Sequence, residues 1–464
     1  MAILTFYGAT GTVTGSRFLL EINNKKLLID CGLFQGSKQN RLKNWETFPV
    51  NPGEVERILL THAHIDHTGY LPRFCKDGFM GKIHCTHTTY DFLEILLKDS
   101  AHLQEEDAAW ANKKGFSKHK PALPLYTVED AENSLSYFSP VNYGEDLFIE
   151  DNLRVKFKDA GHILGSSFID VRIRDGNKRK KILFGGDLGR PNIPILRDPD
   201  QVFDVDYLVL ESTYGDRLHN DDSPMKNLAR VINESVDRGG VLIIPSFAIG
   251  RTQTLLYAIR QLEEENKIPS LSVFVDSPMA IDATEIFKKR IAEQDFHARL
   301  GFLKGKQIFQ PKRLQICKSR SQSKEINKQK NRAVIISASG MVNGGRILHH
   351  MIERLPNPKN TILFVGYQAE GTRGRAMLEG IEKLKIHGKY VPVKAKIETI
   401  SGYSGHADYR EILAWLMGFN RPPKKTFLVH GEPVARNALK EKIEEHFGWE
   451  VAVPEFGESF DLEL

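Results

Sequence analysis

The sequence predicts an α/β protein of two domains, with the second domain inserted into the first. Its 464 residues exceed the roughly 250–300 that a single hydrophobic core usually serves. The first half alternates short strand-like and helix-like segments, whereas from about residue 213 helices alternate with strongly apolar strands. Near residue 385 the first pattern returns, so we expect the end of the chain to rejoin the first domain.

Short apolar runs bounded by turn residues predict the strands of the first domain. They are Ile3–Tyr7, Arg17–Ile22, Lys26–Ile29, Arg57–Leu60, Arg154–Lys158, Phe168–Arg174, Lys181–Phe184 and Tyr207–Leu210. Apolar residues at helical spacing predict a helix over Tyr90–Leu97. A capping pattern at Thr127-Val-Glu-Asp130 predicts the start of another.

The second half predicts βαβ units around a parallel sheet. Its strands are expected at Val241–Pro245, Leu271–Val275, Ala333–Ser337 and Thr361–Val365, with a helix at Arg251–Glu264. Strands at Tyr390–Val393 and Lys396–Ile400 and helices at Tyr409–Met417 and Val434–His446 are expected after them.

Composition excludes several classes of protein. Hydrophobic residues at 41%, charged residues at 27%, and ordinary Gly and Pro usage exclude collagen-like, low-complexity and wholly disordered chains. The four cysteines form no CxxC pair, which predicts a reduced, cytoplasmic protein. The first residues lack the pattern of a signal peptide, and no apolar run is long enough to span a bilayer, so we expect no membrane partner.

Positive charge is concentrated in one segment. The chain carries 64 Lys and Arg against 59 Asp and Glu, a net charge of +5 that permits a polyanionic partner without requiring one. Residues 312–332 carry eight Lys and Arg and one acidic residue, Glu325. Two interpretations stay open here: a solvated, partly mobile loop, or a strip that contacts a phosphate backbone.

Three histidines and one aspartate fall within six residues after an apolar strand: His62, His64, Asp66 and His67. Imidazole nitrogens and a carboxylate oxygen suit Zn²⁺, and this density of ligands could hold two ions. His162 and Asp187 follow other strands beside glycines that allow close backbone approach. Asp30 fits a carboxylate that orients a ligating histidine, and equally fits a turn cap.

This pattern resembles the metallo-β-lactamase superfamily, whose HxHxDH signature matches His62, His64, Asp66 and His67. The resemblance implies a first zinc bound by His62, His64 and His162. It implies a second zinc bound by Asp66 and His67, with Asp187 bridging the two ions. Asp30 matches the aspartate of the first family motif.

Within that superfamily the sequence is similar to the β-CASP nucleases. Three further motifs carry this similarity: Glu211 in Leu210-Glu211-Ser212-Thr213, His406 in Gly405-His406-Ala407, and His430 in Val429-His430-Gly431. The similarity covers essentially the whole chain. It implies an αββα sandwich formed by residues 1–212 and 388–464, and an inserted α/β β-CASP domain on a mostly parallel sheet at residues 213–387.

The resemblance implies a zinc-dependent ribonuclease that hydrolyses single-stranded RNA, as an endonuclease, a 5′ exonuclease or both. RNA-acting members such as RNase J have a histidine at the position of His430, where DNA-acting members have an aliphatic residue. His430 is also expected to bind the second zinc. The resemblance thus implies two zinc ions per chain, and Mn²⁺ or Fe²⁺ could replace zinc at the same nitrogen and oxygen ligands. His406, held by Glu211, is the expected general acid, and Asp66 is counted as both ligand and catalytic residue.

RNA is the expected partner, a homodimer is allowed, and we expect no redox or nucleotide cofactor. Small residues and a cation in the inserted domain are expected to bind phosphate: Ser337, Ser339, Gly340, Met341 and Arg346. Arg251, Arg373 and Arg375 are weaker candidates, because a surface ion pair would explain each.

Two other functions compete with the ribonuclease. A small-molecule hydrolase of the same core fold would need only the ligands from His62 to Asp187, and would have no use for Glu211, His406 or a long inserted domain. A non-catalytic RNA-binding scaffold would have lost ligands, whereas this sequence keeps all of them. A DNA nuclease is disfavoured by His430.

Overall fold

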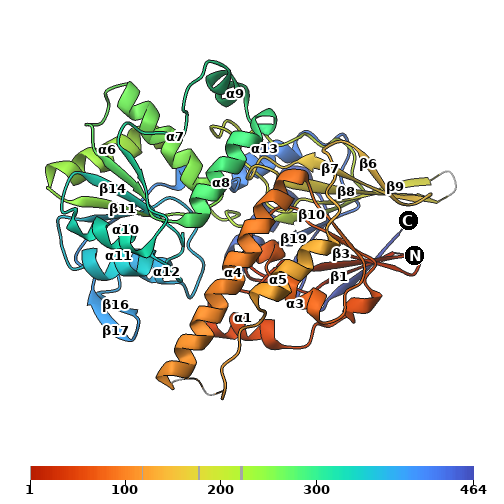
Figure 1. Cartoon of the computed structure of the whole chain (residues 1–464). Coiled ribbons are helices and arrows are strands. Elements are labelled where there is room, and N and C mark those ends of the chain that lie inside the picture. Colours follow the sequence, from red (N-terminus) through yellow and green to blue (C-terminus); the bar gives the residue numbers. More distant parts are fainter. Residues whose placement is uncertain (1, 116, 118, 176–177, 220–222, 464) are drawn as a thin grey trace. The chain divides into compact units, whose positions relative to one another are not determined.

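The computed structural model describes residues 2–115, 117, 119–175, 178–219 and 223–463. The chain folds into two compact units (Figure 1). Unit 1 consists of Met1–Leu218 and His406–Leu464, and unit 2 consists of His219–Gly405. The chain therefore leaves unit 1, forms unit 2 and returns, so that unit 2 is an insertion in unit 1.

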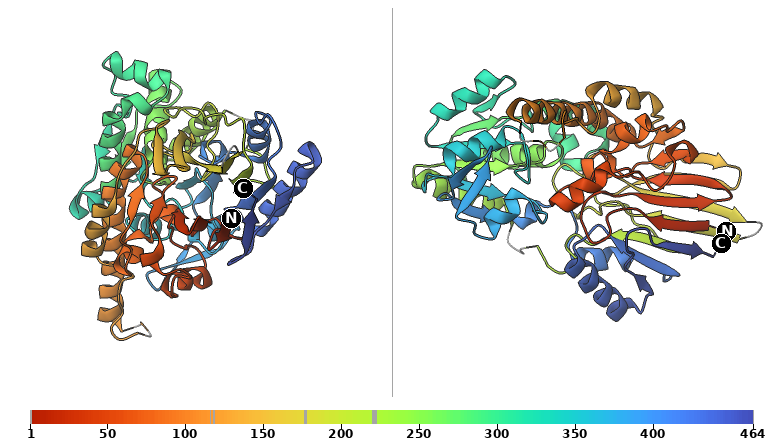
Figure 2. Two further views of the ribbon diagram at one scale, coloured as in Figure 1. Left: turned by 90° about the vertical axis from the view of Figure 1, so that its right-hand side faces the viewer. Right: turned by 90° about the horizontal axis from the view of Figure 1, so that it is seen from below.

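One sheet of unit 1 has the strand order β21-β1-β2-β3-β4-β5. Its strands are β1 (Ala2–Phe6), β2 (Phe18–Ile22), β3 (Lys25–Ile29), β4 (Arg57–Leu59), β5 (Lys82–His84) and β21 (Ser459–Leu462). Strands β3, β4 and β5 run parallel, and the other pairs are antiparallel. Since β21 pairs with β1, the two ends of the chain lie side by side (Figure 2).

The other sheet of unit 1 has the order β20-β19-β10-β9-β8-β7-β6. Its strands are β6 (Asp146–Glu150), β7 (Leu153–Asp159), β8 (Ser167–Asp175), β9 (Lys178–Phe184), β10 (Tyr207–Glu211), β19 (Lys425–Val429) and β20 (Val451–Ala452). Strands β9, β10, β19 and β20 are parallel neighbours, while β6 to β9 form an antiparallel meander. The C-terminal strand β19 thus lies inside a sheet built mostly from the first half of the chain.

Alternating side chains give the two sheets of unit 1 a shared apolar interior. Phe6 and Leu20 of one sheet pack in the same buried cluster as Phe157, Phe184 and Phe427 of the other. Each fully buried side chain of this size contributes about 1.5–3 kcal/mol to folding. The expected sandwich of two sheets is therefore present.

Helices cover the outer faces of this sandwich. They are α1 (Lys38–Leu42), α2 (Ile65–Thr68), α3 (Leu71–Lys76), α4 (His87–Lys114), α5 (Val128–Ser134), α13 (Tyr409–Leu416) and α14 (Pro433–Phe447), with short 3-10 turns η1 (Lys43–Trp45), η2 (Pro52–Glu54) and η3 (Leu135–Tyr137). Leu416 of α13 and Leu439 of α14 pack against Leu208 and Leu428 of the second sheet. The capping box predicted at Thr127 and Asp130 is present at the start of α5, so this prediction is confirmed.

Unit 2 is an α/β domain on a parallel sheet of order β13-β12-β14-β11-β15-β18. Its strands are β11 (Val241–Pro245), β12 (Ser272–Val275), β13 (Leu314–Ile316), β14 (Ala333–Ser337), β15 (Thr361–Phe364) and β18 (Lys396–Thr399), and β16 (Lys383–Ile386) and β17 (Lys389–Pro392) form a separate hairpin. Its helices are α6 (Pro224–Asp237), α7 (Arg251–Glu264), α8 (Pro278–Lys289), α9 (Phe296–Leu303), α10 (Arg320–Glu325), α11 (Ile347–Arg354) and α12 (Arg373–Leu378), with 3-10 turns η4 (Ile291–Glu293), η5 (Ile326–Lys328) and η6 (Ser401–Tyr403). The strand pairings of the larger sheet are all parallel.

The return point of the chain differs from the predicted boundary at residue 387. The structure keeps residues 388–405 in unit 2, because β18 pairs in parallel with β15 at the edge of its sheet. The predicted start at residue 213 likewise moves to His219. A strand-like pattern indicates a strand but not the sheet that it joins.

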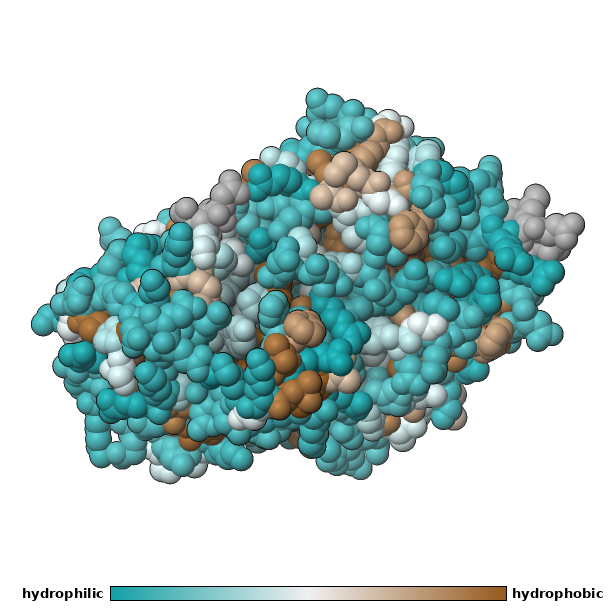
Figure 3. All heavy atoms as spheres, turned by 90° about the horizontal axis from the view of Figure 1, so that it is seen from above, coloured by the Kyte–Doolittle hydropathy of each residue, from teal (hydrophilic) through white to brown (hydrophobic). Residues whose placement is uncertain are grey.

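The surface carries scattered apolar side chains. The face shown in Figure 3 is mostly hydrophilic, with small separate apolar groups. No helix in the described ranges is long and apolar enough to cross a bilayer.

Candidate metal centre

Strand ends bring the predicted ligands of unit 1 together. Strands β9, β10 and β19 are parallel neighbours, so their carboxyl ends meet at one edge of the sheet. Asp187 follows β9, Glu211 is the last residue of β10, and His430 follows β19. The four ligands of the His62–His67 segment follow β4 of the facing sheet, on the loop and short helix α2.

Four donor atoms from three loops converge on one point. His62 Nε2 lies 3.1 Å from His64 Nδ1, which lies 3.3 Å from His162 Nε2. Asp187 Oδ2 lies 3.4 Å from the Nε2 atoms of both His62 and His162. A tetrahedral zinc ion with bonds of about 2.0–2.1 Å separates its ligand atoms by about 3.3–3.4 Å. The donor set therefore fits a tetrahedral ion without rearrangement.

A second donor set lies on the other side of Asp187. His430 Nε2 is 3.3 Å from both Asp66 Oδ2 and His67 Nε2. Asp187 Oδ1 is 3.2 Å from His67 Nε2. One carboxylate thus faces the first set with Oδ2 and the second set with Oδ1, the arrangement that a bridging ligand requires. Both sets combine imidazole nitrogen with carboxylate oxygen, the donors typical of zinc sites that carry out catalysis.

Asp30 and Thr61 hold the ring of His67. Asp30 Oδ2 accepts a hydrogen bond from His67 Nδ1 at 2.7 Å, and its other oxygen accepts the backbone N–H of Thr61 at 2.8 Å. Burial opposes a charge on His67, but Asp187 and Asp30 together raise the pKa of His67 well above its usual value. With Nδ1 bonded to Asp30, Nε2 is the ring atom that faces the second donor set.

Thr213 holds His430 in a similar way, and sequence reasoning assigned no role to it. Thr213 Oγ1 lies 3.1 Å from His430 Nδ1, which leaves Nε2 directed toward Asp66. Thr61 Oγ1 lies 3.0 Å from Nδ1 of His62. A single threonine gives no signal in a sequence: the Thr61 contact depends on side-chain orientation in the loop after β4, and the Thr213 contact depends on the pairing of β10 with β19.

Two site residues adopt left-handed backbone conformations. Asp30 has φ of 58° and His430 has φ of 47°, a region that costs most residues energy and is enriched at functional sites. The N–H of His430 donates to the carbonyl of Ala9 at 2.7 Å, which fixes this turn. Gly32 lies so close to Asp66 that an added Cβ would be 1.6 Å from the Asp66 carbonyl oxygen.

Glu211 and His406 form a pair beside the two donor sets. His406 Nδ1 lies 3.1 Å from both carboxylate oxygens of Glu211, and Glu211 also accepts the N–H of Leu188 at 2.8 Å. Burial opposes protonation of His406, but Glu211 and Asp187 raise the pKa of His406 to about 9. Glu211 thus holds the imidazole of His406 through Nδ1.

The centre is open on one side. The side chains of Asp66 and His406 are 20% and 16% exposed, whereas those of His62, His67 and Asp187 are at most 2% exposed. Of these five side chains, Asp66 and His406 are therefore the ones that solvent contacts. Burial also lowers the pKa of His64 to about 3, so its ring is neutral and able to act as a ligand.

Three family models match successive parts of the chain. The metallo-beta-lactamase superfamily matches residues 11–233, the Beta-Casp domain matches residues 252–377, and the Zn-dependent metallo-hydrolase RNA specificity domain matches residues 390–454. Ribonuclease TTHA0252 of Thermus thermophilus is 34% identical over 453 residues, which cover 97% of this chain and 98% of that protein. The chain belongs to the β-CASP family of the metallo-β-lactamase superfamily.

Other relatives agree with this family. The RNase J-like protein of Methanocaldococcus jannaschii is 30% identical over 93% of each chain. The transcription termination factor FttA of the same organism is 28% identical over 92% of this chain and 67% of its own length. A solved structure of a protein of unknown function from Enterococcus faecalis V583 shares the fold, with a TM-score of 0.54 and 14% identity over 99% of this chain and all of the other.

In the β-CASP domain of unit 2, the predicted phosphate-binding residues lie around the turn after β14. Ser337 is buried and its Oγ donates to the carbonyl of Asp276, while Ser339 and Met341 are half-buried and Gly340 is buried. Arg346 donates to the Asp276 carboxylate at 2.8 Å and to the carbonyl of Lys318 at 2.7 Å. Its guanidinium thus holds the turn in place, and a direct contact with phosphate stays a prediction.

The three weaker arginine candidates of the β-CASP domain differ in their contacts and burial. Arg373 donates to the carbonyls of Asn343 and Lys385, at 3.0 Å each. Arg375 pairs with Glu379 at 2.7 Å on α12, the surface ion pair that the sequence left open. Arg251 is half-buried at the start of α7. Their role toward phosphate stays a prediction.

The basic segment 312–332 is more ordered than a plain loop. It contains β13, α10 and η5, and its eight Lys and Arg side chains are all exposed. Lys328 pairs with Glu325, the acidic residue of the segment. Most of its positive charge therefore faces the solvent, where a polyanion can reach it.

Proposed function

We propose that this β-CASP protein is a two-zinc ribonuclease that hydrolyses phosphodiester bonds in single-stranded RNA. The observation that carries this proposal is Asp187, whose two oxygens each face a separate set of histidine and aspartate donors. The Glu211–His406 pair beside them favours the same reaction, because a small-molecule hydrolase has no need of it. The relatives named as ribonucleases and the match to an RNA specificity domain favour RNA as the substrate.

Two zinc ions bound at these sets would supply a hydroxide at neutral pH and neutralise the phosphate charge. The protein's own residues orient the ligands and transfer the proton. Asp30 and Thr213 fix the rings of His67 and His430, so that ligand nitrogens need no reorientation. His406 donates a proton from Nε2 to the leaving oxygen, and Glu211 accepts the Nδ1 hydrogen bond that keeps the imidazole in place.

The same proposal includes the cytoplasm as the place of action. All four cysteines are free thiols. Burial raises the pKa of Cys31 to about 12 and that of Cys317 to about 11, so both thiols stay protonated and unreactive at neutral pH. A reducing compartment suits such residues.

The test is cleavage of single-stranded RNA labelled at the 5′ or the 3′ end by purified protein of measured metal content. A matching DNA and the His67→Ala variant are the controls. Cleavage of RNA alone, lost in His67→Ala, is the expected result, and the pattern of labelled products separates endonuclease from 5′ exonuclease. Intact RNA in the presence of two bound zinc ions would refute the proposal and favour the small-molecule hydrolase.

A further inference from the structure

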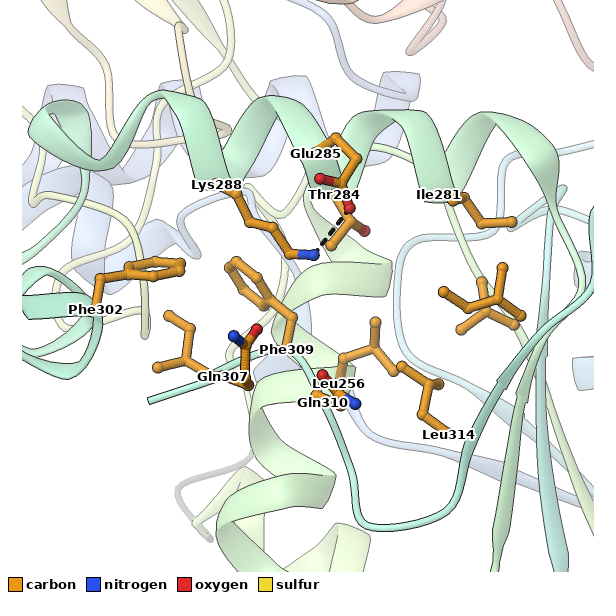
Figure 4. A pocket seen from close by; sticks show the side chains of 13 residues that line it. Leu256, Ile281, Thr284, Glu285, Lys288, Phe302, Gln307, Phe309, Gln310 and Leu314 are labelled. Atoms are coloured by element: carbon orange, nitrogen blue, oxygen red, sulfur yellow. Dashed lines mark hydrogen bonds and ion pairs between the residues drawn. The ribbon is translucent and has the colours of Figure 1, made fainter. Parts of the chain in front are cut away.

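The β-CASP domain contains a hollow that the metal centre does not use. It lies between α8, α9 and the segment that leads into β13, and it has a volume of about 280 Å³. Figure 4 shows Phe302 and Phe309 side by side along one wall, with Lys288 above them and Gln307 below. Every residue that lines it belongs to unit 2, so the hollow exists within this domain alone.

The walls combine aromatic rings with unused amide groups. Phe309 is 3% exposed and its ring meets Phe302 edge-to-face with centroids 5.8 Å apart, while Phe302 is only half-buried and presents part of its ring to the hollow. The carboxamides of Gln307 and Gln310 are exposed at the rim and make no hydrogen bond to the described residues. An aromatic face beside free amide donors and acceptors is what a planar, hydrogen-bonding ligand requires.

Positive charge predominates around the hollow, where the lining carboxylate of Glu285 is paired with Lys288. Residues 304–324, which form part of its wall, contain seven Lys and Arg and no Asp or Glu, and all seven side chains are exposed. They are Lys304, Lys306, Lys312, Arg313, Lys318, Arg320 and Lys324. An apolar protein segment would gain nothing from this row of cations, whereas single-stranded nucleic acid needs both a cationic surface for its backbone and aromatic faces for its bases.

The size of the hollow agrees with one base. A hollow of about 280 Å³ has room for a group the size of a nucleobase, which has about ten non-hydrogen atoms. A base pair or a folded helix is too large to enter. An unpaired base is a ligand of this size, and single-stranded RNA offers such bases whereas double-stranded RNA does not.

We propose that this hollow holds one unpaired base of single-stranded RNA against Phe302, while the cations of residues 304–324 bind the adjacent phosphates. The proposal rests on the proposed function for the identity of the polymer. It assigns an anchoring site to the β-CASP domain itself, in addition to the metal centre of unit 1. The sequence did not indicate it, because Phe302 and Phe309 lie on different elements and no motif joins them.

The test measures binding without cleavage. Metal-stripped full-length protein is titrated into a fluorescent single-stranded RNA and into an oligomer of equal length that has the same phosphates but no bases. Phe302→Ala should weaken RNA binding about tenfold or more, the usual effect of losing one stacked base, and leave binding of the abasic oligomer unchanged. A triple Lys304→Ala, Lys306→Ala, Lys312→Ala variant should weaken binding of both oligomers.

The chain offers a matched control for Phe302. Phe296 lies on the same helix, is 71% exposed and does not line the hollow, so Phe296→Ala should bind both oligomers like the parent. Phe302→Leu keeps an apolar side chain but removes the ring, and it should lose RNA binding as Phe302→Ala does. Thermal melting of each variant confirms that the domain is folded.

Three results would overturn the proposal. Unchanged RNA binding in Phe302→Ala would show that the cations alone hold RNA. Equal losses for RNA and the abasic oligomer would show that Phe302 only maintains structure. A change in self-association of Phe302→Ala, with RNA binding unchanged, would show that the hollow receives a second copy of the chain.

Activity separates this proposal from the proposed function. In zinc-loaded protein, Phe302→Ala should raise KM for a long RNA and leave the turnover of bis(p-nitrophenyl) phosphate, which has no base, unchanged. If the parent protein cuts no RNA but the base-dependent binding is found, the proposed function fails and the anchoring site stands. If it cuts RNA and Phe302→Ala has the parent's KM, the anchoring site fails alone.

Discussion

Replacing Asp30 by asparagine should weaken one metal site and spare the other. The oxygen of the new side-chain amide can still accept the N–H of Thr61, but its NH₂ group would face the Nδ1–H of His67, donor against donor. His67 then gains a hydrogen bond only if its proton moves to Nε2, which is the atom that faces Asp66 and His430. The substitution therefore removes the lone pair that the second ion needs.

The size of this effect follows from the bond that is lost. A hydrogen bond to a charged group is worth about 1.5–3 kcal/mol, and Asp30 is fully buried, so solvent does not replace it. If the whole loss falls on metal binding, affinity for the second ion decreases about 10- to 150-fold. This agrees with the usual 10- to 100-fold effect of removing a carboxylate that supports a ligating histidine.

The assay is a zinc titration against a chromophoric chelator, which separates two binding steps. The tight step, assigned to His62, His64 and His162, should keep its affinity in Asp30→Asn, and the weak step should shift. Asp170→Asn is the matched control, because Asp170 is also fully buried in unit 1 but pairs with Arg172 instead of a histidine. Two unchanged steps in Asp30→Asn, or loss of the tight step alone, would refute the reasoning.

Three further predictions concern other residues. His406→Ala should slow RNA hydrolysis about 10²- to 10⁴-fold but spare a substrate with a very good leaving group, and equal losses would exclude a general acid. Thr213→Val should weaken the second zinc step and Thr213→Ser should restore it, as the same titration measures. Burial opposes ionisation of Asp276, but bonds from His350, Ser323 and Arg346 hold its pKa below the usual value. The stabilisation from these bonds is fully present above the unfolded pKa of about 3.8 and is lost as pH falls through the lower folded pKa. Asp276→Asn should therefore melt well below the parent at pH 6, and the difference in melting temperature should narrow as pH falls below 3.8.

Local patterns predicted some elements of the β-CASP domain with their exact bounds. The expected strand Val241–Pro245, helix Arg251–Glu264 and strand Ala333–Ser337 have the observed bounds, because each is strongly apolar or periodic and is bounded by turn residues. Helix α4 was predicted only over Tyr90–Leu97, since its later part is polar and helical by propensity alone. Short edge strands such as β13 gave too few residues for a period.

Some residues of the candidate site could be predicted from the sequence and others could not. The cluster from His62 to His67 is visible in the sequence because its ligands are neighbours along the chain. His162 and Asp187 were candidates because they follow strands beside glycines, but their assignment to the two ions came from the family resemblance. His430 was found through the resemblance alone, since spacing does not reveal which strands become neighbours. Thr61 and Thr213 remained unseen because each acts through single side-chain contacts, Thr61 with the adjacent His62 and Thr213 with the distant His430.

Because unit 2 is inserted in unit 1, the two parts of unit 1 are synthesised at different times. Residues 406–464 leave the ribosome after residues 219–405, and they carry His406, His430 and strand β19, which lies between β10 and β20. Until β19 arrives, β10 is the edge of an unfinished sheet and the second donor set lacks His430. The two donor sets and the Glu211–His406 pair are therefore complete only after the last part of the chain has joined unit 1.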